Sequence, residues 1–363
     1  MDNIEYLLAL HSVNGLGPVR LKALLGYYKD PKLAWEAEAK EILKIGIPQN
    51  TVSLLVETRK KLKPEKYLEL IEKSGIKFLT VFDEKYPALL KQIYDPPTVL
   101  YYKGEILPDD GRAVAVVGTR NLTGYGKTVS ERFAFDLASL GVTIVSGLAR
   151  GVDTEAHKAA ISAKGRTLAI LGGGLKNIYP PENTELAEKI TRGFGAVISE
   201  YPFDIPYSRG MFPSRNRIIS GFSLGVLVTE AAVNSGSLIT ARAALDQGRE
   251  VFAVPGPITS EFSKGPSYLI KQGAKLVTSA DEILEELGID KSVKYEVLSI
   301  EKETKLTATE KVILENLVNE KIHIDEICRS LGLSESEVAA ALVKMEISGL
   351  VKNLGGGTYI KIC

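Results

Sequence analysis

AVAVVGTR, residues 113–120, joins five small or branched apolar side chains directly to a glycine, a threonine and an arginine. A continuous apolar run of this kind is typical of a strand that is buried on both faces of a parallel sheet. Similar runs recur through the middle of the chain at 142–146, 167–171, 196–199, 225–229, 250–254 and 275–278. Segments with helical spacing separate them, at 127–140, 154–163, 185–190, 237–247 and 266–272. The alternation predicts the α/β class, with a doubly wound, mostly parallel, Rossmann-like sheet in a domain over residues 76–287.

The start of that domain, residues 76–111, is predicted to be a connecting stretch with two strand-like runs at 76–81 and 99–102. Residues 1–75 are predicted to be helical, and the turn NGLGP at 14–18 is typical of a helix-hairpin-helix, SAM-like domain. Hairpin glycines of that motif can expose backbone N–H groups to a phosphate. A turn that only packs, or that contacts a protein partner, has the same sequence pattern, so both roles stay open.

Beyond the sheet, residues 288–304 are rich in lysine, glutamate and serine and are predicted to be a linker. Residues 305–363 are predicted to form three helices, at 307–317, 324–331 and 334–349, followed by a hairpin around the glycines at 355–357. This order is typical of a winged-helix domain, whose third helix usually enters a DNA groove. Here that helix carries three glutamates and one lysine, so a protein-contact role stays open as well: Glu335, Glu337, Glu346 and Lys344.

Composition limits the class of protein without defining a ligand. The 363 residues include 45 Lys and Arg and 45 Asp and Glu, so binding of a nucleic acid would depend on where the positive charge lies. Two cysteines are too few for a disulfide framework or a zinc site, which fits the cytoplasm, and no metal is expected. The N-terminal residues lack the pattern of a signal peptide, and no apolar run reaches the roughly 18 residues of a membrane span.

The loops that follow the predicted strands share one composition. Each carries a glycine close to a strand end and a helix start: Gly118, Gly147, Gly174 and Gly236. Ligands of doubly wound sheets bind at this edge, beyond the carboxyl ends of the strands. Because small residues leave the backbone open there, we expect free N–H groups that accept an anionic oxygen.

The details of these loops favour a polyanion over a single nucleotide. A dinucleotide site needs G-x-G-x-x-G after the first strand and an acid at the end of the second, and both are missing. NLTGYGKT at 121–128 matches a P-loop except at its first position, so a nucleotide-binding enzyme stays as the alternative function. Arginine matches phosphate and also stacks on bases. Four arginines lie in or next to the loops: Arg120, Arg150, Arg215 and Arg217.

No catalytic constellation accompanies the loops. His157 is the one histidine of the central region, and it lies one turn after Asp153, a well-placed helix cap, so packing explains it better than base catalysis. No nucleophile elbow or metal-ligand spacing occurs. The chain is therefore predicted to be a binding protein without catalytic residues or cofactor, although Glu200 and Glu230 leave a hydrolase open.

Five motifs resemble the DNA-processing protein A family, also called Smf, in the order found there. They are VVGTR at 116–120, SGLARGVD at 146–153, FPSRNRII at 212–219, SGSLITA at 235–241 and VPG at 254–256. The resemblance implies a homodimer without catalytic activity that holds single-stranded DNA and delivers it to a RecA-type recombinase during natural transformation or recombination. The chain is also similar to proteins that displace single-strand-binding protein. A wider group with this fold includes phosphoribohydrolases, but their Gly-Gly-x-Gly-Thr-x-x-Glu loop is missing here.

By motif position, the resemblance makes Arg120 the leading DNA contact. Together with the loops it gives the predicted DNA-binding set Gly118, Thr119, Arg120, Gly147, Arg150, Gly174, Lys176, Arg215, Asn216, Arg217, Ser235, Gly236 and Ser237. It implies a dimer surface at Tyr268, Ile270, Lys271 and Leu276. The sequence departs from the family at one position: Pro181 follows the Tyr179-Pro180 pair, where some relatives carry a basic residue. Lys176 is a candidate to supply the missing positive charge.

Overall fold

The structure is a computed structural model that describes residues 2–208 and 210–290 and, further on, 307, 309–310, 312–313, 317, 322–347, 351–353 and 355–361. Within these residues no helix combines the length and the apolar character needed to cross a membrane. The chain divides into two compact units, Met1–Leu298 and Ser299–Cys363. The predicted linker at 288–304 spans this division, and most of it lies outside the described residues.

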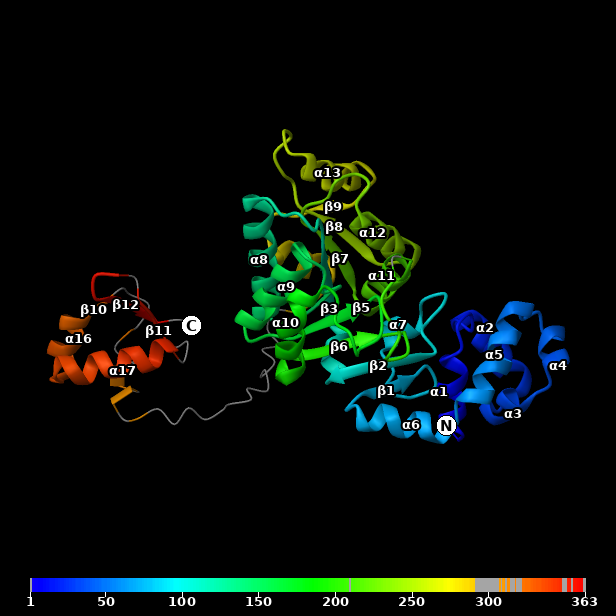
Figure 1. Ribbon diagram of the computed structural model, residues 1–363. Helices are drawn as coiled ribbons and strands as arrows, with labels where there is room; N and C mark the ends of the chain where they lie inside the picture. Colours follow the sequence, from blue (N-terminus) through cyan, green and yellow to red (C-terminus); the bar gives the residue numbers. More distant parts are fainter. Residues whose placement is uncertain are drawn as a thin grey trace. The chain divides into compact units, whose positions relative to one another are not determined.

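A nine-stranded sheet forms the centre of the first unit (Figure 1). Its strands are β1 (Lys77–Thr80), β2 (Val99–Gly104), β3 (Ala113–Val117), β4 (Thr143–Ser146), β5 (Thr167–Leu171), β6 (Gly195–Ser199), β7 (Gly225–Val228), β8 (Glu250–Ala253) and β9 (Lys275–Leu276). They lie in the order β1-β2-β6-β5-β4-β3-β7-β8-β9. Strands β3 to β9 run parallel, whereas β1 and β2 pair antiparallel at one end. The stretch 76–111 therefore extends the sheet instead of only leading into it.

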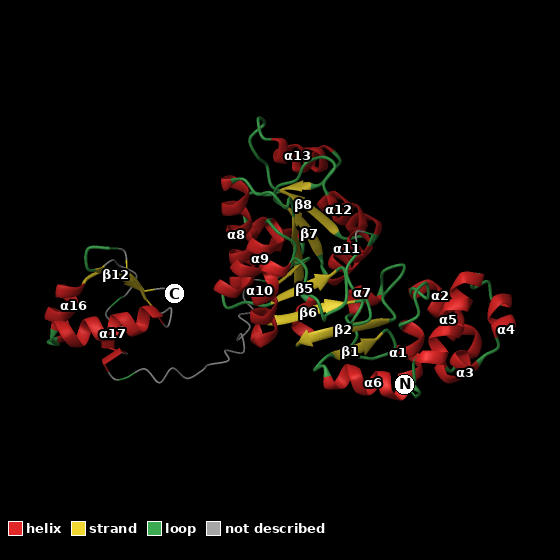
Figure 2. Ribbon diagram, viewed as in Figure 1, coloured by secondary structure: helices red, strands yellow, loops and turns green. Residues whose placement is uncertain are grey.

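Helices cover both faces of this sheet (Figure 2). They are α7 (Ala88–Lys91), α8 (Gly124–Ser139), α9 (Val152–Ser162), α10 (Thr184–Lys189), α11 (Met211–Phe222), α12 (Gly236–Asp246), α13 (Lys264–Lys271) and α14 (Ala280–Glu286). Val114 and Val116 of β3 pack with α8 and α9. Ala115 and Val117, which alternate with them, pack with α11 and α12. The strands are thus buried on both faces, and the doubly wound, mostly parallel sheet is confirmed.

Six helices precede the sheet: α1 (Ile4–His11), α2 (Pro18–Tyr28), α3 (Pro31–Glu36), α4 (Ala39–Lys44), α5 (Gln49–Lys61) and α6 (Pro64–Lys73). They share a core with the sheet, because Leu7 and Leu24 belong to the same buried cluster as Tyr101 of β2. At the predicted hairpin, Gly15 has a left-handed φ of 90°, and its carbonyl accepts a 2.9 Å hydrogen bond from Arg20. The boundary predicted at residue 75 therefore lies inside one continuous core.

In the second unit the described elements include β10 (Ile322–His323), α16 (Ile324–Leu331), α17 (Glu335–Ile347), β11 (Val351–Asn353) and β12 (Thr358–Lys361). β12 pairs antiparallel with β10 and β11, as expected for a winged helix. A capping box starts α17: the Glu337 N–H donates to Ser334 Oγ at 3.4 Å, and the Ser334 N–H donates to the Glu337 carboxylate at 3.1 Å. The helix predicted at 307–317 lies partly outside the described residues.

Candidate nucleic-acid interface

A cleft of about 880 Å³ opens at the carboxyl ends of the central strands. The strand order explains the position of the cleft. After β3 the chain adds β4, β5 and β6 on one side of β3, and it then adds β7, β8 and β9 on the other side. Ligand clefts of doubly wound sheets form where the order reverses in this way. The loops after β3 and β4, the first half of α11 and the start of α12 line the cleft.

Most of the predicted DNA-binding residues meet in or beside this cleft. Those that line it are Gly118, Arg120, Arg215, Asn216, Ser235, Gly236 and Ser237. Gly147 and Arg150 line a much smaller hollow that Arg120 and Arg215 also border. The fold therefore gathers residues from four separate loops and helix starts at one place.

Three other predicted residues do not line the cleft. Thr119 is buried, and its hydroxyl oxygen accepts a 3.1 Å hydrogen bond from the N–H of Asn121. Gly174 packs against the backbone of residues 202–203, where a side chain would collide. Lys176 is exposed and does not line the cleft. The suggestion that it replaces the basic residue missing at Pro181 therefore has no support from a contact with the cleft.

Arg217 belongs to an ion cluster and not to the lining of the cleft. Its guanidinium forms ion pairs with Glu200 and, at 3.1 Å, with Asp95, and its side chain is 16% exposed. Burial raises the pKa of Glu200 to about 7, an effect that the charge of Arg217 opposes. Because removal of one partner of a buried pair leaves the other charge uncompensated, we assign Arg217 to stability.

Arg215 supplies a buried charge beneath the cleft. The residue is 4% exposed, and its Nη1 donates to the carbonyl of Gly147 at 2.6 Å and to the carbonyl of Ile170. A side chain at position 147 would collide with this guanidinium, which explains the glycine there. Burial lowers the pKa of Arg215 to about 10, so the group stays protonated at neutral pH. Arg215 thus places a protonated guanidinium beneath the cleft, with the buried Asp153 as a nearby opposite charge, while its hydrogen bonds go to the protein.

Three amides of these loops already donate within the protein, where the sequence led us to expect free N–H groups. The Asp153 carboxylate accepts hydrogen bonds from the N–H groups of Gly147 at 3.0 Å and of Ala149 at 3.3 Å. The N–H of Thr119 donates to the carbonyl of Glu230 at 2.6 Å. Hydrogen bonds to a carboxylate are strong, so a phosphate does not readily displace Asp153. These three amides are therefore not available to an anion in the cleft, and side chains such as Arg120 are the better candidates.

Arg120 and three aromatic rings form an accessible wall of the cleft. Arg120 is exposed, and its guanidinium carbon lies 5.5 Å from the ring centre of Phe212. The ring centres of Tyr179 and Tyr207 are 4.0 Å apart, and that of Phe212 is 5.8 Å from Tyr179. These rings were not among the predicted site residues. An aromatic residue close to an arginine in the sequence is a pattern typical of single-strand sites, and it could have found Phe212, three residues before Arg215. Tyr179 has no arginine near it in the sequence.

The stretch that matches a P-loop contacts the protein itself. Glu230 follows β7 and is buried, and its carboxylate accepts hydrogen bonds from the Thr123 N–H at 3.1 Å and the Thr123 hydroxyl at 2.6 Å. A side chain at Gly126 would collide with this carboxylate. Lys127 pairs with Glu131 on the exposed side of α8. A carboxylate thus stands at the helix start where a P-loop holds phosphate, which disfavours a nucleotide triphosphate there.

His157 packs in the core, as its sequence context indicated. It is fully buried, and its Nδ1 lies 2.6 Å from Thr167 Oγ1. Burial lowers the pKa of His157 to about 3, so the ring is neutral at physiological pH. His157 is not among the residues that line the cleft, and it therefore has no geometry for proton exchange with a ligand bound there.

Fold and cleft together define a class: a Rossmann-like domain with an arginine- and aromatic-lined cleft at its switch point, accompanied by N-terminal helices and a winged-helix unit. The sequence profile of the family described as DNA recombination-mediator protein A matches residues 77–288. The profile of the DprA winged helix domain matches residues 301–357. The chain belongs to the family of DNA recombination-mediator protein A, and the resemblance drawn from the five motifs is confirmed.

Individual relatives agree with this assignment. Protein Smf of Escherichia coli strain K12 is 38% identical in an alignment of 357 residues that covers 95% of this chain and 95% of that one. The X-ray structure of DNA processing protein A from Streptococcus pneumoniae matches with a TM-score of 0.69 and 36% identity, over 79% of this chain and 99% of that one. DNA processing protein A from Helicobacter pylori, a structure described for its single-stranded DNA binding mode, matches with a TM-score of 0.52 and 30% identity, over 58% and 95%.

Proposed function

We propose that this chain holds single-stranded DNA in the cleft, without changing it chemically, and passes it to a RecA-type recombinase during natural transformation or recombination. The observation that carries the proposal is the cleft wall, where the exposed Arg120 lies over Phe212 beside the Tyr179–Tyr207 pair. Arginine neutralises phosphate, and aromatic rings stack on unpaired bases. The single-stranded DNA binding mode described for the Helicobacter pylori relative supports the same ligand.

The hand-off to a recombinase rests on family membership alone. A mediator would act in the cytoplasm on strands that single-strand-binding protein already covers. The measurement is the lag before a recombinase filament grows on such covered strands, with and without this chain. An unchanged lag would limit the function to DNA binding.

Single strands are expected to bind more tightly than a duplex of equal length. Stacking contributes about 1–3 kcal/mol per base, so the preference should be about tenfold or more if one base reaches the rings. The logarithm of the binding constant should fall linearly with the logarithm of salt concentration. Fluorescence anisotropy of labelled oligothymidine and of a hairpin duplex, titrated at several salt concentrations, measures both quantities. Equal affinity for the two forms would place the DNA site outside the cleft.

The proposed homodimer would form through α13 and β9. β9 is the last strand in the order of the sheet, and edge strands are open to a second chain. Tyr268 is 47% exposed and Leu276 is 44% exposed, so two large apolar side chains face outward there. Ile270 is partly buried and Lys271 is exposed. Exposed apolar groups at a sheet edge favour an interface over a purely solvated surface.

Leu276→Glu is expected to turn the dimer into a monomer and to leave the chain folded, because the leucine is exposed within a single chain. Sedimentation equilibrium of wild type and variant measures the change. Leu70→Glu is the matched control, since Leu70 is 50% exposed on α6 and should not affect the dimer. A wild-type chain that remains monomeric at about 100 μM would contradict this interface, since a stable dimer associates well below that concentration.

A further inference from the structure

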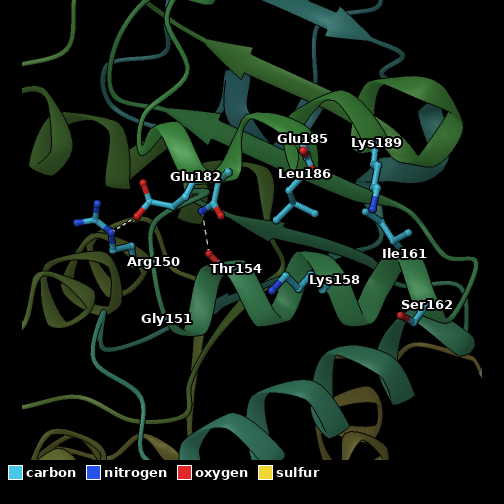
Figure 3. Close-up of a pocket in the computed structure, with 11 residues that line it drawn as sticks. Arg150, Gly151, Thr154, Lys158, Ile161, Ser162, Glu182, Glu185, Leu186 and Lys189 are labelled. Atoms are coloured by element: carbon cyan, nitrogen blue, oxygen red, sulfur yellow. Dashed lines mark hydrogen bonds and ion pairs between the residues drawn. The ribbon is translucent and has the colours of Figure 1, made fainter.

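A second concave surface lies between α9 and α10 and has a volume of about 610 Å³ (Figure 3). Lys158 projects from α9, and Lys189 projects from α10 on the opposite side. Arg150 stands at one end of this groove, beside Glu182. The cations of the groove are therefore spread over its two walls and one end, where a chain of phosphates could contact them. Glu182 and Glu185 also line the groove, and Lys158 pairs with Glu155 at 3.2 Å, so phosphates would have to replace these carboxylates at the cations.

The small hollow beside the cleft lies between the cleft and the groove and shares an arginine with each. Arg120 lines both the cleft and the hollow. Arg150 lines both the hollow and the groove. Tyr179 and Pro180 form part of the hollow between them. Cleft, hollow and groove thus lie next to one another, and an arginine borders each neighbouring pair.

We propose that the groove between α9 and α10 continues the DNA path, so that phosphates leaving the cleft pass Arg150 and bind Lys158 and Lys189. The inference rests on the proposed function, because it assumes a single strand in the cleft. A solvated pair of helix faces would also carry lysines. The shared arginines distinguish the groove from such a surface, since they place its end directly beside the cleft.

Glu182 competes with the DNA in this arrangement. Its carboxylate pairs with Arg150, and the two side chains are 48% and 56% exposed. Exposed ion pairs contribute little free energy, so a phosphate can replace the carboxylate at Arg150. The neighbouring Asn183 is buried and donates at 2.8 Å to the carbonyl of Leu148 and at 2.8 Å to Thr154 Oγ1. These bonds keep Glu182 at the junction, where it can only weaken the hold of Arg150 on DNA.

The dependence of affinity on DNA length tests the groove separately from the cleft. Oligothymidines of about 4 to 24 nucleotides bracket the usual site size of single-strand binding modules. For wild type, affinity should keep rising after the cleft is filled. Lys158→Glu/Lys189→Glu should bind the shortest oligomers like wild type but bind the longest about tenfold more weakly, with a salt slope smaller by about 1.4 for two lost phosphate contacts. Lys61→Glu/Lys73→Glu is the charge-matched control, on exposed positions of α5 and α6.

Glu182→Ala should act in the opposite direction and strengthen the binding of long oligomers severalfold, because Arg150 loses its competitor. An identical length dependence in wild type, the groove variant and the control would overturn the inference, provided that Arg120→Ala still weakens binding. If Arg120→Ala has no effect, the proposed function itself fails. A groove variant that loses short and long oligomers equally would also overturn the inference, because the lysines would then act on the cleft.

Discussion

Arg120→Ala is expected to weaken the binding of single-stranded DNA by about ten- to hundredfold, because a hydrogen bond to a charged group contributes about 1.5–3 kcal/mol. Arg120 is exposed on the wall of the cleft, with its guanidinium over the ring of Phe212. Both phosphate and base can reach it there, whereas the other cleft arginine, Arg215, is buried. The loss should be similar for all base sequences, since a phosphate contact carries no sequence information.

Anisotropy titrations of wild type and Arg120→Ala with oligothymidine and a mixed-sequence strand measure this effect. The salt slope should decrease by about 0.7 if one phosphate contact is lost. Arg132→Ala is the matched control, because Arg132 is 70% exposed on α8 and pairs only weakly, at 3.7 Å, with Asp136. Equal affinity of wild type and Arg120→Ala, with a normal unfolding transition, would show that the cleft is not the DNA site.

The sheet and the place of the cleft could be predicted because they follow from local pattern. A run such as 113–117 has to be buried on both faces, and the carboxyl ends of parallel strands meet at one edge. Gly118, Ser235 and Ser237 were predicted from their position after strands, and they line the cleft together; that they bind DNA stays a prediction. Arg120 was predicted in the same way, from its place three residues after the end of β3.

Which polar groups are bonded within the protein and which remain open to a ligand could not be predicted, since this depends on partners far away in sequence. Arg215 and Arg217 belong to one motif and lie two positions apart, yet one lies beneath the cleft and the other pairs with Glu200. The amide of Gly147 is taken by Asp153 only because the loop folds back onto the start of α9. Tyr207 enters the aromatic group from a loop that carries no motif. Spacing in sequence predicts where the backbone goes, whereas burial decides which donors remain for a ligand.

Because Arg215 is buried, we expect it to stabilise the fold more than it contacts DNA. The motif alone made Arg215 a DNA contact, but its Nη1 donates to two carbonyls beneath Gly147, and its charge lies close to the buried Asp153. Removal of the guanidinium would leave two buried carbonyls without their donor and the nearby buried Asp153 without an opposite charge, and both changes are costly in a buried site. Arg120 is exposed, so its substitution should lower the affinity for DNA and leave the free energy of unfolding unchanged. Substitution of Arg215 should chiefly lower the free energy of unfolding.

Arg215→Met is therefore expected to lower the free energy of unfolding by about 3–5 kcal/mol. Urea unfolding followed by the fluorescence of Trp35 measures this, because Trp35 is the single tryptophan and belongs to the core that the N-terminal helices share with the sheet. Asp153→Asn added to Arg215→Met should recover part of the loss, since the uncompensated carboxylate is then removed, although the amide hydrogen bonds to Asp153 weaken too. If Arg215→Met unfolds like wild type but no longer binds single strands, Arg215 contacts the DNA directly and has no role in stability.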